Sequence, residues 1–421
     1  MHTLSPLPSI RFIHTADIHL GKSYHRSPAE GERFEDFFRM LGSIINDAIQ
    51  EQVDFVLLAG DLFHTGHILP KTFARTIEVL TPLKNAGIPC IAVEGNHDWI
   101  HRRDNISWME ALSQMGYLQL LRPTRSDDGS YYFAPFNYTT GQGGVITIKG
   151  AHIYGLGYIG TQAGSHVERI CQAVTTKNNI LLFHVGIWSY SPVEIGAMKP
   201  EEALLLADSF SYVALGHGHK PYTVAHKNGR IFAYNPGSPE CVNFGEERYP
   251  KGYYLVTAEN ETYHHQFIPV IPRPMLTCSI DLEGVSTIDE ALLRLDASLS
   301  VLELPSHNRH QVLLCIKLHG AISCNPFELH RERIRSLVLP HLTPLHLEIK
   351  NLTTRAGKRP GEQESVSLQS IEEEVLRDLL TQDSSYKGQE DALVTLCLAL
   401  REQIINGNGD ADELVGMVRE L

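Results

Sequence analysis

The chain lacks any apolar run of the roughly 18 residues that a membrane-spanning helix needs. It has 421 residues, and its first six, Met1–Pro6, lack the basic and apolar regions of a signal peptide. Its seven cysteines are odd in number and form no Cys-x-x-Cys pair, which disfavours a disulfide framework. These absences predict a cytoplasmic protein of two or three domains that crosses no membrane.

The net charge of −13 is unevenly distributed. Residues 361–421 carry 14 acidic and 4 basic side chains, whereas residues 309–360 carry 9 basic and 3 acidic ones. A basic segment beside an acidic tail is compatible with phosphate binding on the first and a separate role for the second. Both segments can equally be ordinary solvated surface.

Short β-rich runs alternate with helical patterns over the first 270 residues, which predicts a layered α/β domain. The predicted strands are Ile10–His14, Phe55–Ala59, Cys90–Val93, Ile180–His184 and Tyr212–Gly216, and the helices are Glu30–Gln52, Leu69–Ala86 and Ile106–Met115. Further predicted strands lie close together and suggest an antiparallel portion: Val145–Lys149, His152–Gly155, Ile231–Tyr234 and Gly252–Val256. We therefore expect two packed mixed β-sheets flanked by helices.

Three prolines, at positions 269, 272 and 274, mark the end of this first domain, residues 1–270. A small α+β domain is predicted over residues 275–353, followed by a linker over 354–365 and a helical acidic tail over 366–421. The elements predicted in the small domain are strands Thr277–Glu283, Val312–His319 and Leu345–Leu352 and helices Thr287–Leu302 and Asn325–Leu337. In the tail one helical face carries Leu393, Leu396, Cys397, Leu400 and Ile404. That face either folds back on its own domain or docks a partner.

Five polar motifs follow predicted strands, so their side chains are expected at one edge of a sheet, where α/β folds bind ligands. They are Asp17-Ile18-His19, Gly60-Asp61, Gly95-Asn96-His97-Asp98, Phe183-His184 and Gly216-His217-Gly218-His219. Their oxygens and nitrogens suit two divalent metals such as Mn²⁺, Fe²⁺ or Zn²⁺, a pair typical of phosphate-ester cleavage. Asp61 is the natural bridging carboxylate. Asp17 and His19 share a face if the strand conformation continues through them.

The ordered set Asp-x-His, Gly-Asp, Gly-Asn-His-Asp, His and Gly-His-x-His over residues 17–219 resembles the calcineurin-like metallophosphoesterases. The resemblance implies the following metal ligands: Asp17, His19, Asp61 and His219 for one ion, and Asp61, Asn96, His184 and His217 for the other. It also implies that His97 faces the scissile phosphate and assists the leaving group or the transition state. Asp98 is expected to orient its neighbours rather than to bind metal.

The Leu-Phe-His sequence after Asp61, and Asn235-Pro236-Gly237-Ser238, resemble the SbcD-type double-strand-break repair nucleases. The resemblance implies Mn²⁺-dependent exonuclease action on duplex DNA ends and endonuclease action on single strands, by in-line attack of a metal-bound hydroxide. It implies that His64 contacts the phosphate and that residues 275–353 form a capping domain that can bind DNA. It further implies an SbcC-type coiled-coil ATPase as partner and a homodimer formed through Leu69–Ala86 and Ile106–Met115.

Positive charge in the predicted nuclease domain is local, although DNA binding normally depends on Lys and Arg. The candidate DNA contacts follow two metal motifs and comprise Lys22, His25 and Arg26, and Arg102 and Arg103 beside His101.

Two alternative functions stay open. One is a phosphoesterase for nucleotides or another small molecule, because the fold does not decide the substrate. The other is a non-enzymatic interaction module with a structural metal site.

Overall fold

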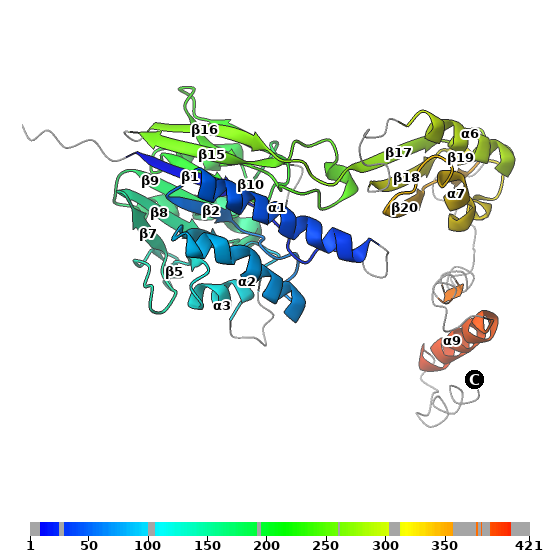
Figure 1. Ribbon diagram of the computed structural model, residues 1–421, viewed down its shortest axis with the longest axis horizontal. Coiled ribbons are helices and arrows are strands. Elements are labelled where there is room, and N and C mark those ends of the chain that lie inside the picture. The colour runs from blue at the N-terminus through cyan, green and yellow to red at the C-terminus, as the bar shows by residue number, and fades with distance from the viewer. Residues whose placement is uncertain are drawn as a thin grey trace, which may run out of the picture.

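The computed structural model describes residues 9–24, 29–99, 106–191, 195–259, 262–302, 312–356, 376–377, 380 and 388–405. Two six-stranded sheets pack against each other, and helices cover their outer faces (Figure 1). This arrangement confirms the predicted α/β fold class. A smaller α+β unit lies to one side of the two sheets.

The first sheet has the strand order β16-β15-β1-β2-β3-β4. Its strands are β1 (Ile10–Thr15), β2 (Phe55–Ala59), β3 (Cys90–Val93), β4 (Gln119–Leu120), β15 (Gly252–Glu259) and β16 (Thr262–Pro269), and its helices are α1 (Glu30–Gln50), α2 (Pro70–Asn85) and α3 (Trp108–Gln114). β1 to β4 run parallel, whereas β15 and β16 are antiparallel to their neighbours. Each helix is slightly shorter than predicted. For example, α3 begins only after Ser107, whose side chain accepts the N–H of Glu110.

The second sheet has the order β13-β14-β12-β9-β8-β7. Its strands are β7 (Val145–Ile148), β8 (Ala151–Leu156), β9 (Asn179–Phe183), β12 (Tyr212–Leu215), β13 (Tyr222–Ala225) and β14 (Ile231–Asn235), covered by α4 (Ala163–Gln172) and α5 (Pro200–Leu206). Two antiparallel pairs, β7 with β8 and β13 with β14, bear out the antiparallel portion. Gly252–Val256 is antiparallel as well, but in the other sheet, where β15 pairs with β1 and β16.

The layer between the sheets is apolar and aromatic. Phe12 of β1 stacks on Phe55 of β2 at 4.8 Å and meets Tyr212 of β12 edge-on at 5.2 Å. Every residue of β2 and of β9 is buried, as expected for strands covered on both faces. This packing holds the carboxyl ends of β1, β2 and β3 close to those of β9 and β12.

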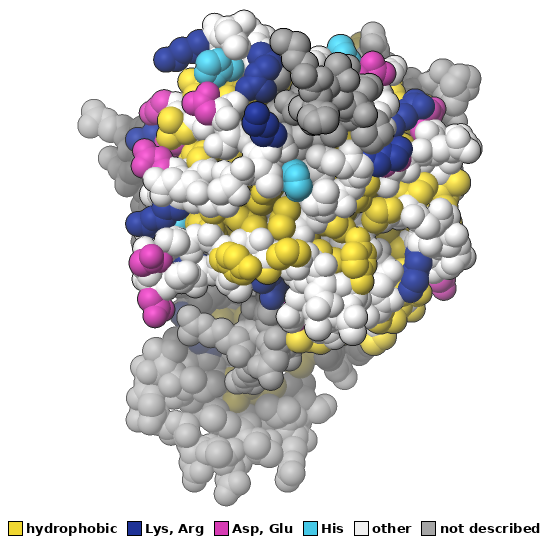
Figure 2. All heavy atoms as spheres, turned by 90° about the vertical axis from the view of Figure 1, so that its left-hand side faces the viewer, with side chains coloured by type: hydrophobic (Ala, Val, Ile, Leu, Met, Phe, Trp, Pro, Cys, Tyr) yellow, Lys and Arg dark blue, Asp and Glu magenta, His cyan; other side chains and the backbone are white. Residues whose placement is uncertain are grey.

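The face at the end of the molecule farthest from the small unit is shown in Figure 2. Apolar side chains gather in its middle, and Lys and Arg lie mostly toward its rim. β1 begins at this end, whereas the polar motifs follow the opposite, carboxyl ends of the strands (Figure 1).

The small unit has a parallel sheet of order β17-β18-β20 and a core of its own. Its elements are β17 (Met275–Asp281), α6 (Ile288–Ser300), β18 (Leu313–His319), β19 (Ala321–Ile322), η3 (Pro326–Glu328), α7 (Arg331–Val338), β20 (His346–Asn351) and β21 (Thr354–Arg355). The helix predicted over Asn325–Leu337 is interrupted, because His330 has an extended backbone. The predicted linker begins with β21, which pairs with β19.

Contacts between the small unit and the two sheets are specific. Tyr24, in the loop after β1, stacks on His346 of β20 at 4.1 Å. Cys241 and Phe244 pack with Met275 and other residues of the small unit. The loop that leaves β1 therefore touches both parts of the molecule.

The predicted tail helix is α9 (Glu390–Ile405), in which Val394 is buried. Docking of a partner on α9 stays a prediction, and most of residues 366–421 lie outside the described part. Within that part, no helix is both long and apolar enough to cross a membrane. The remaining short elements are β5 (Thr124–Arg125), β6 (Tyr131–Tyr132), β10 (Gly186–Ile187), β11 (Ala197–Met198), η1 (Gly160–Gln162) and η2 (Phe244–Glu246).

Candidate metal centre

The loops that follow β1, β2, β3, β9 and β12 meet at one edge of the packed sheets. They bring together all seven side chains proposed as ligands from the sequence: Asp17, His19, Asp61, Asn96, His184, His217 and His219. The ligand atoms of Asp17, His19 and His219 lie within 4.8 Å of one another, and so do those of Asp17, Asp61 and His184. Residues some two hundred positions apart therefore form a single site.

Asp61 occupies the middle of this site. Its Oδ2 lies 3.8 Å from Nε2 of His19 and 3.5 Å from Nε2 of His184. On one side, His19 Nε2 faces His219 Nε2 at 3.0 Å. On the other, His184 Nε2 faces Asn96 Oδ1 at 3.2 Å. A carboxylate between two such pairs can touch two cations at once.

The backbone at the ligands is unusual. Asp17, His19, Asp61 and His217 have positive φ values of 54°, 54°, 51° and 76°. Such conformations cost a non-glycine residue about 1–3 kcal/mol each and persist where the surroundings enforce them. Here the N–H of Asp17 donates to the Gly60 carbonyl at 3.1 Å, and that of His19 donates to the Asp61 carbonyl at 3.0 Å. The condition under which Asp17 and His19 would share a strand face is not met, because β1 ends at Thr15.

Three histidines of the second sheet are each held by the ring nitrogen that points away from the centre. Nδ1 of His184 donates to the Ala59 carbonyl at 2.7 Å, and Nδ1 of His219 donates to Oε1 of Glu246 at 2.8 Å. His217 uses Nε2 instead, which donates to the Ile195 carbonyl at 2.7 Å. These bonds fix the tautomers and leave the other nitrogen of each ring free to bind a metal.

Glu246 is a residue of the candidate site that sequence reasoning missed. It lies 27 positions after His219 and belongs to no recognisable motif. Its carboxylate also accepts from Nζ of buried Lys251 at 2.7 Å. Burial alone would raise its pKa, but the hydrogen bond from His219 and the charges of His219 and Lys251 lower the pKa of Glu246 to about 2. Burial lowers the pKa of His219, yet Glu246 and Asp17 raise it more.

Glycines beside the ligands permit close approach of the chains. A Cβ on Gly60, whose φ is +85°, would lie 2.2 Å from Nδ1 of His184. A Cβ on Gly95 would lie 2.0 Å from Oδ1 of Asp61, and one on Gly216 would lie 2.0 Å from the Ala59 carbonyl oxygen. A larger residue at any of these three glycines would therefore clash with a side chain or the backbone of the centre.

The residues present fit two divalent cations. Oδ2 of Asp17 is buried without a hydrogen-bond partner, and burial raises the pKa of the Asp17 carboxyl to about 6. A positive ion would offset the cost of burying this charge. Two carboxylates, one amide and four imidazoles form a donor set typical of Mn²⁺, Fe²⁺ or Zn²⁺.

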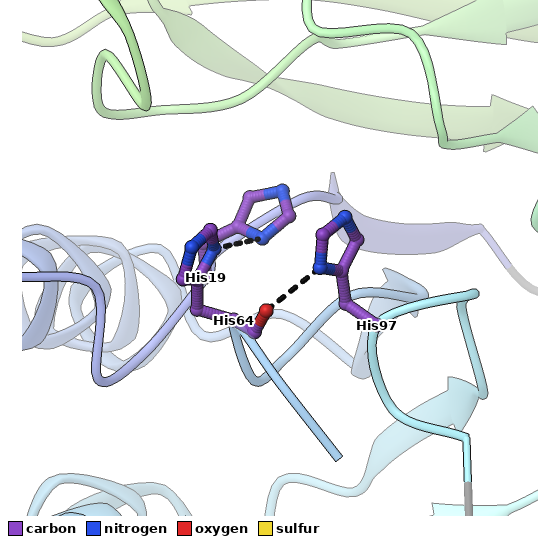
Figure 3. Close-up of side chains that lie close together, drawn as sticks. All are labelled: His19, His64 and His97. Carbon is purple, nitrogen blue, oxygen red and sulfur yellow. Dashed lines mark hydrogen bonds between the residues drawn. The ribbon is translucent and has the colours of Figure 1, made fainter. Parts of the chain in front are cut away.

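Two further histidines flank His19 (Figure 3). Nδ1 of His97 donates to the His64 carbonyl at 2.7 Å, and the His64 ring stacks on that of His97 at 5.4 Å. Nδ1 of His64 lies 3.4 Å from Nδ1 of His19. Burial, together with the charge of Lys22, lowers the pKa of His64 to about 4. The N–H of His97 also donates to Oδ1 of Asp61 at 2.9 Å, which ties His97 to the centre.

Asp98 is buried and points away from the metal ligands. It accepts the N–H groups of Phe63 and Gly95 at 2.9 Å each, and that of Leu62 at 3.3 Å. Burial raises the pKa of its carboxyl well above the usual range. Asp98 thus joins the loop that carries Asp61 to the loop that carries Asn96.

The other predicted residues are only partly described. Lys22 lies next to the centre, and burial lowers its pKa, but His25, Arg26, Arg102 and Arg103 lie outside the described residues. On the two helices proposed for the homodimer, the buried core of this chain already uses Leu80, Leu83, Met109 and Leu112. Leu69, Ile106 and Met115 stay exposed at or beside the ends of these helices.

Comparison with known proteins identifies the class. A model of the family described as calcineurin-like phosphoesterase matches residues 10–221, about half of the chain, and the chain belongs to this family. The predicted family is thereby confirmed.

The DNA double-strand break repair protein Mre11 of Saccharolobus solfataricus is 27% identical over 282 residues, covering 66% of this chain and 68% of that protein. The Mre11 of Archaeoglobus fulgidus is 27% identical over 302 residues, covering 68% and 64%. The matches thus span about two thirds of each relative's length. A crystal structure of a dimetal phosphatase from Danio rerio aligns with 62% of this chain and 99% of that chain, at 13% identity and a TM-score of 0.35.

Proposed function

We propose that this phosphoesterase cleaves DNA with two metal ions, Mn²⁺ by preference, as an exonuclease on duplex ends and an endonuclease on single strands. The observation that carries the proposal is the Asp61 carboxylate, whose Oδ2 lies 3.8 and 3.5 Å from Nε2 of His19 and His184. The proteins named Mre11 among its relatives support DNA as the substrate and double-strand-break repair as the context.

Asp61 and the remaining ligands are proposed to hold the ions as the family resemblance implies, with Asp17, His19 and His219 on one side and Asn96, His184 and His217 on the other. When bound, the ions would neutralise phosphate charge and activate the attacking water. The chain's own part is to hold the phosphodiester beside His97. Because Nδ1 of His97 donates to the His64 carbonyl, Nε2 is left for the substrate, and the doubly protonated ring would give its Nε2 proton to the leaving oxygen. His64 is proposed to contact the phosphate.

Several partner roles belong to the same proposal. The two-sheet unit would act as the nuclease domain, the small unit as a DNA-binding cap, and Lys22 as a contact to the DNA backbone. An SbcC-type ATPase would dock on α9, and a second copy of the chain would meet α2 and α3. The exposed Leu69, Ile106 and Met115 leave apolar surface for such a dimer.

A nuclease assay on His97→Ala tests the proposal. Wild-type protein with Mn²⁺ is expected to degrade linear duplex DNA and to nick single-stranded circles. The variant is expected to lose activity by about 100-fold or more, within the range of general acid catalysis. Its metal content and melting temperature should stay those of wild type, and His264→Ala, at an exposed histidine of β16, is the matched control.

Two results would overturn the proposal. One is a pure, metal-loaded protein that leaves every form of DNA intact with and without an ATPase partner. The other is turnover of a mononucleotide or a cyclic nucleotide far faster than DNA, which would identify a small-molecule phosphoesterase of the same family.

A further inference from the structure

The two sides of the metal centre differ in chemistry. Beside His19, a cavity is lined by Lys22, Lys71, His64 and His67 together with Glu30 and uncharged residues, so this side carries more basic than acidic side chains and two imidazoles. Beside His217, the neighbouring side chains are aromatic. This asymmetry matches the two parts of a nucleotide, a charged phosphate and a flat base.

Tyr158 forms the inner part of the aromatic side. Its ring lies 5.4 Å from the ring of His217 and 6.1 Å from that of His184. Its backbone N–H donates to the Glu94 carbonyl at 2.8 Å, next to the motif that carries Asn96. Gly196 packs directly on the ring, since a Cβ there would lie 2.3 Å from Cε2 of Tyr158. The ring is thus held in place while remaining only half-buried.

Trp99 forms the outer part. Its indole meets the Tyr158 ring edge-on at 5.9 Å and is 55% exposed. Its carbonyl oxygen packs closely on Gly66, since a Cβ there would lie 2.2 Å from it. A large indole that projects into solvent costs hydrophobic free energy unless something covers it.

We propose that Trp99 and Tyr158 form a stacking platform for one unpaired base of the DNA strand beside the scissile phosphate. The inference rests on the proposed function, whose phosphate would sit at the metals next to Tyr158. Proteins that bind single strands commonly pair a basic groove with aromatic rings on which bases stack. A base inside a duplex already stacks on its neighbours, so the platform favours single-stranded DNA and frayed ends over paired DNA.

Tryptophan fluorescence can test the platform directly. The chain has three tryptophans, and Trp108→Phe with Trp188→Phe leaves Trp99 as the sole indole. The probe is a phosphorothioate-linked octathymidylate, which resists cleavage, in the presence of Mn²⁺. We expect the emission of Trp99 to be quenched on binding, and an abasic octamer of the same backbone to cause no quenching.

Binding constants provide the second test. Trp99→Ala is expected to weaken binding of the octathymidylate by about 10- to 100-fold, whereas Trp99→Phe retains most of the affinity. For the abasic octamer, Trp99→Ala should cause no comparable loss. Tyr138→Ala is the matched control, because Tyr138 is an aromatic residue that is 71% exposed and whose ring packs on Phe136 rather than on the metal centre.

The outcomes separate this inference from the proposed function. Equal quenching by both octamers, or unchanged octathymidylate binding by Trp99→Ala, would overturn the platform even if the protein cleaves DNA. Base-dependent quenching without any DNA cleavage would support the platform and refute the nuclease. A protein partner could also cover the Trp99 indole. If it does so while the affinity of the chain for octathymidylate stays unchanged, the exposed indole belongs to a protein interface instead.

Discussion

The two sheets contribute to the metal centre in different ways. The first sheet supplies Asp17, His19, Asp61 and Asn96, and three of these residues have left-handed backbone conformations. The second supplies His184, His217 and His219, and each ring is oriented by a hydrogen bond from its outward nitrogen. The first sheet thus aims its ligands mainly through the backbone, and the second mainly through side-chain hydrogen bonds. Substitutions at backbone positions and at hydrogen-bond partners should therefore perturb the centre in different ways.

The largest effect is expected where the two halves meet. Asp61→Asn removes the charge that both sides share, and turnover of DNA should fall by more than about 100-fold. Loss of a residue that only hydrogen-bonds a metal ligand already lowers metal affinity or activity by about 10- to 100-fold. Metal content measured by mass spectrometry should fall together with activity, while circular dichroism stays unchanged. Full activity in the folded variant would contradict a bridging role.

The next effect concerns the backbone of the first sheet. Gly60→Ala places a Cβ 2.2 Å from Nδ1 of His184 at a φ of +85°. It should lower the free energy of unfolding by about 3 kcal/mol, as strain and a clash add up. Gly229→Ala is the matched control, because Gly229 has a φ of +84° and no neighbour within 4 Å of its Cβ. This control should cost only about 1 kcal/mol, and equal losses in denaturant unfolding would refute the role of close approach.

A smaller effect is expected from a hydrogen-bond partner in the second half. Glu246→Gln weakens the acceptor that orients His219, so affinity for Mn²⁺ should fall by about 10- to 100-fold. Calorimetric titration with the metal measures this change. Glu247→Gln alters an exposed neighbour that bonds Thr277 and should leave affinity as it is. Because Glu246→Gln would leave buried Lys251 without its ion pair, adding Lys251→Met should restore stability but not metal affinity.

The smallest effect, on stability at acid pH, concerns a histidine whose two ring nitrogens are both hydrogen-bonded. His14 of β1 donates from Nε2 to the Leu215 carbonyl and accepts from the Tyr212 hydroxyl through Nδ1, each at 3.0 Å. Burial lowers its pKa to about 3, despite the opposing hydrogen bond. Since the unfolded chain takes up the proton first, stability is lost as pH falls below about 6.5, and about 2 kcal/mol should be gone at pH 5.

His14→Phe should remove that acid-dependent loss. The difference between variant and wild type in unfolding free energy is to be measured at pH 7 and at pH 5. The variant loses two hydrogen bonds at both pH values, so only the change between them reports the titration of His14. Parallel pH profiles would show that His14 is not buried as a neutral ring.

Much of the fold follows from local pattern. β2 and residues 180–183 of β9 are uninterrupted apolar runs, and burial on both faces is what such runs predict. The pairing of β15 with β1 could not be predicted, because Gly252–Glu259 has no sequence signal for a partner more than two hundred positions away. Helix limits differ from the predicted ones by a few residues where single side chains decide them, as Ser107 does for α3.

The centre was predictable as a set of residues but not as geometry. Motif order identified residues such as Asp61 and His219, which the structure brings together. Left-handed turns at Asp17 and His19 could not be read from residue type, since most aspartates and histidines have a negative φ even though both are enriched at positive φ. The sequence did not identify Glu246 or the Ile195 carbonyl. Each accepts a hydrogen bond from the histidine nitrogen that points away from the centre, and such a contact produces no recognisable motif.

The place of β1 between β2 and β15 has a consequence for how the protein is made. Phe12 pairs with Phe55 on one side and with Val256 on the other. The amino end of a chain leaves the ribosome first. One edge of β1 therefore stays unpaired until β15 is made, roughly 240 residues later. During that time this edge offers a template for wrong pairing. Completion of the first sheet, whose edge carries part of the candidate metal centre, is thus a late event in biogenesis.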